Sequence, residues 1–178
     1  SVLARNVVTA DHVSGGRIEL GMGAGWHEGE HRSFGFPFET TKARFDRLTE
    51  QVEIVHRSWG EDPFDFDGRF YRLPECRMYP KPAQQPHPPI HVGGETDAAM
   101  RRVARHGQGW FGFNRQPDQV PEALERLDRA LKTQGRTRDE IEVSVCPYFQ
   151  GTDRDGIKRY EDLGVDRVIV VVFAFDRD

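Results

Sequence analysis

The sequence has few cysteines, no long apolar run and no cluster of basic residues, and each shortage excludes a class of protein. Two cysteines, Cys76 and Cys146, cannot form a disulfide framework, so we expect a reducing compartment, the cytoplasm. The longest apolar run, residues 168–174, is too short to span a bilayer, so we expect no membrane association. The formal net charge of −4, without a run of lysine and arginine, argues against a nucleic-acid binder.

What the sequence does contain is typical of a globular domain with a core. Its 178 residues are 37% hydrophobic and 30% charged, which are ordinary proportions. From residue 89 onward, predicted strands alternate with predicted helices across short turns, which indicates βαβ units and a parallel sheet. We expect strands at 89–94, 109–113, 141–149 and 166–175, and helices at 96–107, 117–135 and 153–164. The last strand is an apolar run, as expected for a strand covered on both faces.

The first half of the chain is less regular. Residues 17–23 predict a fifth strand that ends in a glycine turn, and residues 60–89 predict an excursion rich in proline, glycine and aromatics. Within this excursion, residues 64–73 predict a hairpin with Asp67-Gly68 as its turn. Residues 2–13 predict a helix whose apolar face consists of Val2, Leu3, Val7, Ala10 and Val13. A second helix is expected to be capped by Thr40 or Thr41 and to bury Phe45, Leu48, Val52 and Val55.

Two glycine-containing turns follow predicted strands, which is where parallel sheets place their ligands. The first is GMGAGWHEGEH, residues 21–31, whose glycines would let the backbone approach a ligand closely. It does not fit the dinucleotide fingerprint G-x-G-x-x-G, and a simple tight turn is the alternative. In the second, HVGGETDAAMRR, the pair Gly93-Gly94 precedes a helix that starts near Thr96. The free N–H groups and the dipole of that helix would favour a phosphate, and simple capping by Thr96 is the alternative.

Residues 27–31 also match H-E-x-x-H, the pattern of helical zinc proteases. That chemistry needs both histidines on one face of a helix, one turn apart. Gly29, at the centre of the match, lowers helix propensity by about 1 kcal/mol relative to alanine. No third ligand follows at short spacing, so we expect no metal and interpret His27 and His31 as polar residues of a loop at the mouth of a pocket.

Taken together, these motifs resemble the luciferase-like monooxygenase family, which comprises flavin- and deazaflavin-dependent (β/α)₈ barrels. The matching pieces include GAGW, FDGRFY, PKP and PPIHVGG, and the likeness covers residues 1–115 and continues weakly through EDLGVDRVIVVV. Their form is most similar to that of the coenzyme F420-dependent oxidoreductases. The resemblance implies an α/β fold of the (β/α)₈ TIM-barrel type. Residues 1–178 would form a single partial barrel domain containing about strands 4 to 8, with the excursion at about 60–89 inserted.

The same resemblance implies an enzyme. Coenzyme F420 would exchange a hydride with a small organic substrate, and the alternative is an FMN-dependent monooxygenase. Ala24, Gly25 and Trp26 would line the cofactor. Gly93, Gly94 and Thr96 would hold its phosphate through backbone N–H groups and one hydroxyl. The resemblance names neither the substrate nor a catalytic residue. His27 and His91 are candidates for proton transfer, with a structural role as the alternative for each.

The chain departs from the family in having no counterpart of the first three barrel strands. A complete barrel needs about 250 residues. Five strands alone would leave two open edges and an exposed apolar face. We therefore expect that this chain is part of a longer protein, or that a partner chain completes the sheet in a homo-oligomer. The alternative from another functional class is a binding or assembly protein without catalytic activity, in which the half-barrel pairs with another chain.

Overall fold

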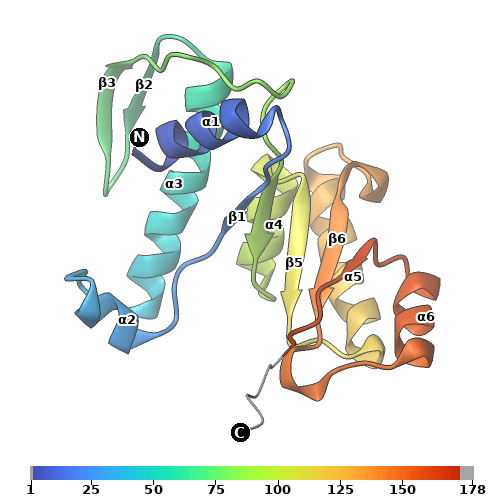
Figure 1. Ribbon diagram of the computed structural model, residues 1–178. Helices are drawn as coiled ribbons and strands as arrows, with labels where there is room; N and C mark the ends of the chain where they lie inside the picture. The colour runs from blue at the N-terminus through green and yellow to red at the C-terminus, as the bar shows by residue number, and fades with distance from the viewer. Residues whose placement is uncertain (1, 173–178) are drawn as a thin grey trace, which may run out of the picture. The chain divides into compact units, whose positions relative to one another are not determined.

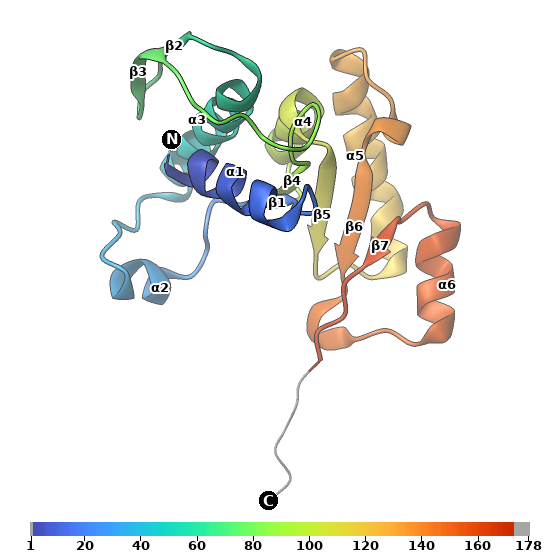
Figure 2. The same cartoon turned by 45° about the horizontal axis from the view of Figure 1, so that its top comes forward.

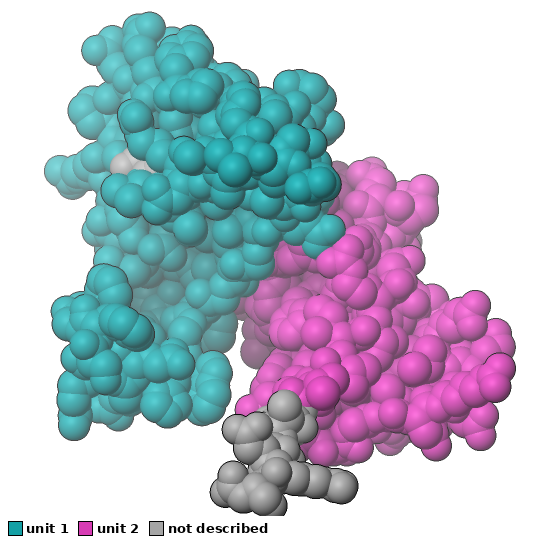
Figure 3. All heavy atoms as spheres, in the orientation of Figure 1, with its two compact units in different colours: residues 1–89 teal, residues 90–178 magenta. Residues whose placement is uncertain are grey.

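The structure is a computed structural model that describes residues 2–172 (Figure 1). The chain forms two compact units, residues 1–89 and residues 90–178 (Figure 3). No helix among residues 2–172 is both long enough and apolar enough to cross a membrane. The first unit contains α1 (Val2–Ser14), β1 (Leu20–Met22), α2 (Glu28–Ser33), α3 (Thr41–Gly60), β2 (Phe64–Asp67) and β3 (Arg72–Cys76).

Helix α1 extends one residue beyond the predicted range and buries a different face. Its buried residues are Ala4, Val7, Val8 and Asp11. Most of the predicted face is wrong: Val2, Leu3 and Val13 are exposed, and only Val7 of that face is buried. The reason is the packing of α1 against α3, where the Trp59 indole N–H donates to the Ala4 carbonyl at 3.3 Å. Hydrophobicity alone does not identify the buried face of α1, because that face depends on where α3 packs.

Helix α3 begins where the sequence predicts. Thr40 is the N-cap, and its hydroxyl oxygen accepts from the Ala43 N–H at 3.3 Å. Such a bond satisfies one of the backbone donors that lack an intrahelical acceptor. Leu48, Val52 and Val55 are buried as predicted, together with Ile54 and Trp59. Phe45, the fourth residue of the predicted face, is half-buried.

The hairpin of β2 and β3 is confirmed, but its turn is longer than Asp67-Gly68. Asp67 is the last residue of β2 and pairs with Arg72, so residues 68–71 connect the strands. The Glu50 carboxylate of α3 accepts from the backbone N–H groups of Arg69, Phe70 and Tyr71 at 2.8, 3.0 and 3.2 Å. This contact from another element fixes the turn, and the local sequence does not encode it.

The second unit is an α/β layer whose four strands form a parallel sheet in the order β4-β5-β6-β7. Val92 lies beside Trp110, and Trp110 beside Val143, and all three are fully or almost fully buried. Helices α4 and α5 pack against each other and cover one face of the sheet (Figure 2). The elements are β4 (Ile90–Gly93), α4 (Asp97–His106), β5 (Gly109–Phe113), α5 (Val120–Thr133), β6 (Glu142–Cys146), α6 (Arg154–Asp162) and β7 (Arg167–Val168).

The α/β class and the alternation of strands and helices are confirmed, and each of the five predicted strands is present, as β1 and β4–β7. The last strand is much shorter than predicted. Strand β7 pairs with β6 only at Arg167 and Val168. Beyond this ladder Ile169, Val170 and Val172 are exposed, so the expectation of burial on both faces is wrong for them. Residues 173–175 of the predicted strand lie outside the described residues.

Candidate functional site

The first unit contains a pocket of about 470 Å³ beside the turn that follows β1. Two of the three residues predicted to line a cofactor there, Ala24 and Gly25, line this pocket. The third, Trp26, is 78% exposed and does not. Side chains from α2, α3 and the hairpin turn complete the lining, which consists of Gly23, Ala24, Gly25, His31, Phe36, Pro37, Glu39, Arg44, Arg47, Gln51 and Tyr71.

Gly25 is required by the geometry of this turn. Its φ of +67° lies in the left-handed region that favours glycine. A Cβ atom at this position would lie 2.7 Å from His31 Cε1. The backbone of the turn therefore passes directly against α2. The sequence predicts that this glycine lets the backbone approach a ligand closely, and in the structure the backbone at Gly25 approaches the His31 side chain of the protein itself.

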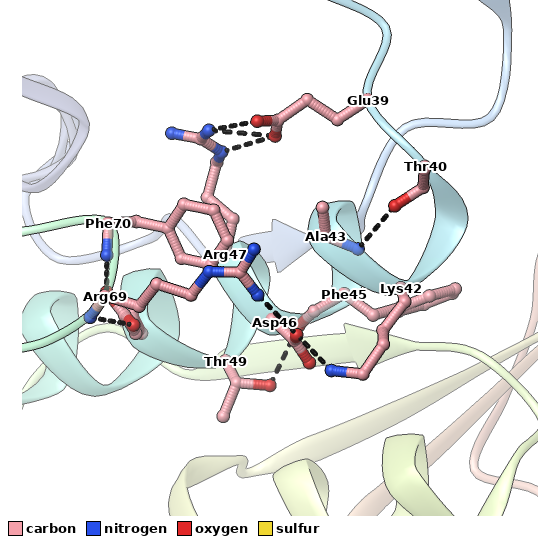
Figure 4. A network of polar contacts seen from close by, with 11 residues as sticks. Glu39, Thr40, Lys42, Ala43, Phe45, Asp46, Arg47, Thr49, Arg69 and Phe70 are labelled. Carbon is pink, nitrogen blue, oxygen red and sulfur yellow. Dashed lines mark hydrogen bonds and ion pairs between the residues drawn. The ribbon is translucent and has the colours of Figure 1, made fainter.

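Two arginines on consecutive turns of α3 provide the charge of the pocket. Arg47 donates to both carboxylate oxygens of Glu39, with Nη2 2.8 Å from each and Nε 3.1 Å from Oε2 (Figure 4). Its guanidinium lies 4.5 Å from the centre of the Phe70 ring. The hydrogen bonds to Glu39 raise the pKa of Arg47 above its ordinary value, so this cation is permanent.

Arg44 has a different set of contacts. Its Nη1 donates to the Gly25 carbonyl, its Nη2 donates to Thr41 Oγ1 at 3.3 Å, and its guanidinium stacks 4.1 Å from the Phe38 ring centre. No carboxylate among residues 2–172 forms an ion pair with it. The sequence motifs identify neither arginine, because the helix pattern presents both as ordinary polar positions between buried ones. The signal that could have found them is their spacing of three on α3, the first long helix after the glycine turn.

Gln51 and Tyr71 add neutral polar groups to the same pocket. The Gln51 amide donates to the Tyr71 hydroxyl at 2.7 Å. Tyr71 reaches this position because the hairpin turn is held on α3 by Glu50. The sequence motifs gave no indication that the hairpin contributes to the wall.

The H-E-x-x-H match forms no pair of ligands on one helix face. His27 is the N-cap of α2, and its Nδ1 accepts from the Glu30 N–H at 3.1 Å. His31 lies inside α2 rather than in a loop, 5.0 Å from the Phe38 ring. Among residues 2–172, no cluster of three His, Cys, Asp or Glu side chains with converging ligand atoms includes either histidine.

The predicted anion site at 93–96 lies in the second unit, at the end of β4. Gly94 has a φ of +119°, and a Cβ atom there would lie 2.9 Å from the Ala99 Cβ. The Gly94 carbonyl accepts from the Trp110 indole N–H at 2.9 Å. Thr96 caps α4, with its hydroxyl oxygen accepting from the Ala99 N–H at 3.2 Å. This junction therefore depends on a glycine at position 94, and the Thr96 hydroxyl, which accepts from Ala99, still has its own proton to donate.

Two acidic side chains flank this junction, and each has an arginine partner. Glu95 faces Arg115 at 3.0 Å and accepts from the Phe113 N–H at 3.1 Å. Burial raises the pKa of Glu95, although Arg115 acts in the opposite direction. Asp97 lies 3.8 Å from Arg126. The carboxylates therefore do not make the junction a strongly anionic surface.

His91, a candidate for proton transfer, is part of the core. It lies in β4 with 8% of its surface exposed. A Cβ atom at Gly109 on the neighbouring strand would lie 2.0 Å from its Nδ1, so the ring occupies the space that this glycine leaves. This packing favours the structural alternative for His91, while its role in proton transfer stays a prediction.

The sequence profile described as luciferase-like monooxygenase matches residues 1–167. An uncharacterized protein of Mycobacterium tuberculosis is 36% identical over 171 residues, which cover 96% of this chain and 56% of the relative. The FMNH(2)-dependent dimethylsulfone monooxygenase of Pseudomonas putida is 36% identical over 114 residues, covering 64% of this chain and 31% of the relative.

Solved structures show the same fold. An F420-dependent secondary alcohol dehydrogenase, in complex with an F420-acetone adduct, superposes with a TM-score of 0.73 at 20% identity, covering 91% of this chain and 48% of that one. At this identity the likeness concerns the fold alone. The chain thus spans about half the length of the relatives that it matches.

Proposed function

The chain belongs to the luciferase-like monooxygenase family, and from this premise we propose that the protein is an oxidoreductase in which coenzyme F420 exchanges a hydride with an organic substrate. The observation that carries the proposal is the glycine-dependent junction at the end of β4, where Gly94 has a φ of +119° ahead of a capped helix. Phosphate groups commonly bind at such helix N-termini.

The residues at this junction fit a phosphate group. A Cβ atom at Gly94 would collide with Ala99, so the backbone is open only because a glycine is present. Ala99 gives its N–H to Thr96, whereas the first two N–H groups of α4 have no acceptor within the helix. The flanking acids are each opposed by an arginine.

In this proposal Gly93, Gly94 and Thr96 hold the phosphate, and Ala24, Gly25 and Trp26 line the cofactor. When bound, the cofactor supplies the hydride chemistry. The chain's own residues would bind the cofactor, orient it and shield it from water. The glycine turns present backbone N–H groups, Thr96 offers its hydroxyl proton, and the exposed Trp26 indole provides an apolar surface that can exclude water.

A second candidate is an FMN-dependent monooxygenase. The observation that favours it is the 36% identity to the dimethylsulfone monooxygenase of Pseudomonas putida, whose name specifies FMNH2. The motifs GAGW, FDGRFY and PPIHVGG favour F420 instead, because their form is most similar to that of the F420-dependent oxidoreductases. Both cofactors carry a phosphate, so the junction at β4 serves either.

Fluorescence titration of the purified chain with F420, and separately with FMN, tests the proposal. We expect micromolar binding of F420 and weaker binding of FMN. The reverse order would replace the proposal with the monooxygenase, and binding of neither would reject a cofactor site in this chain. A Gly94→Ala variant serves as the site-specific control, because its Cβ atom would occupy the space at the start of α4 that the phosphate would need.

Two further features belong to the same proposal. We place the protein in the cytoplasm, which is consistent with the free thiols of Cys76 and Cys146. We also propose a homo-oligomer, supported by the exposed apolar side chains of Ile169, Val170 and Val172 beyond β7. Light scattering after gel filtration would measure the mass, and a monomeric mass across a range of concentrations would reject the oligomer.

A further inference from the structure

The pocket in the first unit is rich in hydrogen-bond donors and poor in acceptors. Arg44 and Arg47 are obligate donors, the Gln51 amide has a second N–H beside the one that it donates to Tyr71, and the Tyr71 hydroxyl adds one O–H. The lining contains one carboxylate, that of Glu39. A pocket with this inventory is complementary to a ligand that carries oxygen acceptors.

The charges of the two arginines are compensated differently. Glu39 neutralises Arg47 through bonds of 2.8 to 3.1 Å to both of its oxygens. Arg44 donates only to a carbonyl and a hydroxyl, and its Nε is buried without a hydrogen-bond partner. With two cations and one carboxylate, the lining has a net charge of about +1, and this charge is located on Arg44.

The pocket also limits the size and shape of the ligand. Its volume of about 470 Å³ lies in the range that accommodates small organic molecules. Phe36 and Pro37 supply apolar lining beside the arginines. A bare inorganic ion would leave this apolar surface unused, so the ligand that fits best joins an anionic head to a compact apolar body.

We propose that this pocket binds a small organic anion, with Arg44 pairing to its carboxylate, sulfonate or phosphonate group. The assignment of this anion as the substrate rests on the proposed oxidoreductase function. The cofactor's phosphate is assigned to the junction at residues 93–96, which leaves the cation in the pocket for a different anion.

The test uses two probes of nearly equal shape and different charge, benzoate and benzamide. Isothermal titration of the purified chain is expected to show benzoate binding at least tenfold more tightly than benzamide. An Arg44→Gln variant should lose on the order of tenfold to a hundredfold in benzoate affinity, the range for a hydrogen bond to a charged group. Arg44→Lys should retain part of this affinity, and Arg17→Gln, at an exposed position outside the pocket, should retain all of it.

The comparison of the two probes on the unaltered chain does not depend on any variant folding correctly. Equal binding of benzoate and benzamide, or binding of neither, would overturn the proposal. Because Ala24 and Gly25 belong both to this pocket and to the proposed lining of the cofactor, the competition is measured with inorganic phosphate rather than with the whole cofactor. Displacement of benzoate by phosphate would assign the pocket to a phosphate group and overturn its assignment to a substrate. Selective benzoate binding in a chain that binds no cofactor would support the anion site and count against the oxidoreductase function alone.

Discussion

The buried carboxylate of Asp11 on α1 accepts two hydrogen bonds from Gln84, 73 residues further along the chain. The Gln84 backbone N–H lies 3.0 Å from Oδ2 and its side-chain amide 2.7 Å from Oδ1. The same amide also donates to the Ile18 carbonyl at 2.8 Å. Burial acts to raise the pKa of Asp11, but the hydrogen bonds from Gln84 lower it below its ordinary value. Asp11 therefore links α1 to the segment that follows the hairpin.

This link predicts a pH-dependent loss of stability. A carboxylate whose pKa is lowered by folding stabilises the folded state above its unfolded pKa, and this contribution is lost as the pH falls through the folded pKa. We expect Asp11→Asn to lower the free energy of unfolding by about 1–2 kcal/mol at neutral pH. Below about pH 4, where the unfolded carboxyl begins to protonate, the difference should shrink. Urea unfolding of both proteins, from about pH 3 to about pH 7, measures this difference. A constant difference across this range would contradict the account.

A second prediction concerns the hairpin turn. Removing the Glu50 carboxylate leaves the N–H groups of Arg69, Phe70 and Tyr71 without their acceptor. Glu50→Ala should lower the free energy of unfolding by about 2 kcal/mol. It should also weaken ligand binding in the pocket, because Tyr71 lies in this turn. Glu53→Ala is the matched control on the same helix. Glu53 pairs with Arg57 at 3.9 Å, so a cost below about 0.5 kcal/mol is expected.

Gly94 provides a third prediction. Alanine would have to adopt a φ of +119° and to place its Cβ 2.9 Å from that of Ala99. We expect Gly94→Ala to cost about 1–3 kcal/mol of stability and to reduce cofactor affinity. Gly60→Ala is the control, since no atom lies within 4 Å of its Cβ position and its φ is not positive. Thermal unfolding and cofactor titration would be measured together. If Gly94→Ala retained full stability and cofactor affinity, the junction would not be glycine-dependent.

The fourth prediction concerns the end of α4. Arg136 Nη1 donates to the carbonyls of Ala104 and Gly107 at 3.1 and 2.9 Å, and carbonyls at a helix end lack a donor within the helix. Arg136→Gln should lower the free energy of unfolding by about 1–2 kcal/mol. Arg129→Gln, at an exposed position on α5, should change it by less than about 0.5 kcal/mol. Equal effects of the two substitutions in denaturant titrations would show that Arg136 does not stabilise the helix end.

The sequence by itself determined the class of fold and the order of its elements. Apolar periodicity, short turns between elements and a capping threonine at position 40 or 41 are local signals, and local signals are sufficient to define helices and strands. The two glycine turns are also predicted from the local sequence. Gly25 and Gly94 adopt there the positive φ angles that glycine permits. The family resemblance was likewise carried by short motifs, and the profile match over residues 1–167 confirms it.

Only the tertiary structure decided which helix faces are buried and which charged side chains line the pocket. Ala4 rather than Val2 is buried on α1, because burial depends on where another helix packs, and the Trp59 indole of α3 donates to the Ala4 carbonyl. The pocket brings Gly25, Arg44 and Tyr71 together from a turn, a helix and a hairpin. The hydrophobic periodicity of the sequence does not predict that these residues share a pocket. Their proximity depends on contacts between segments far apart in the chain, such as those that Glu50 makes with the hairpin turn.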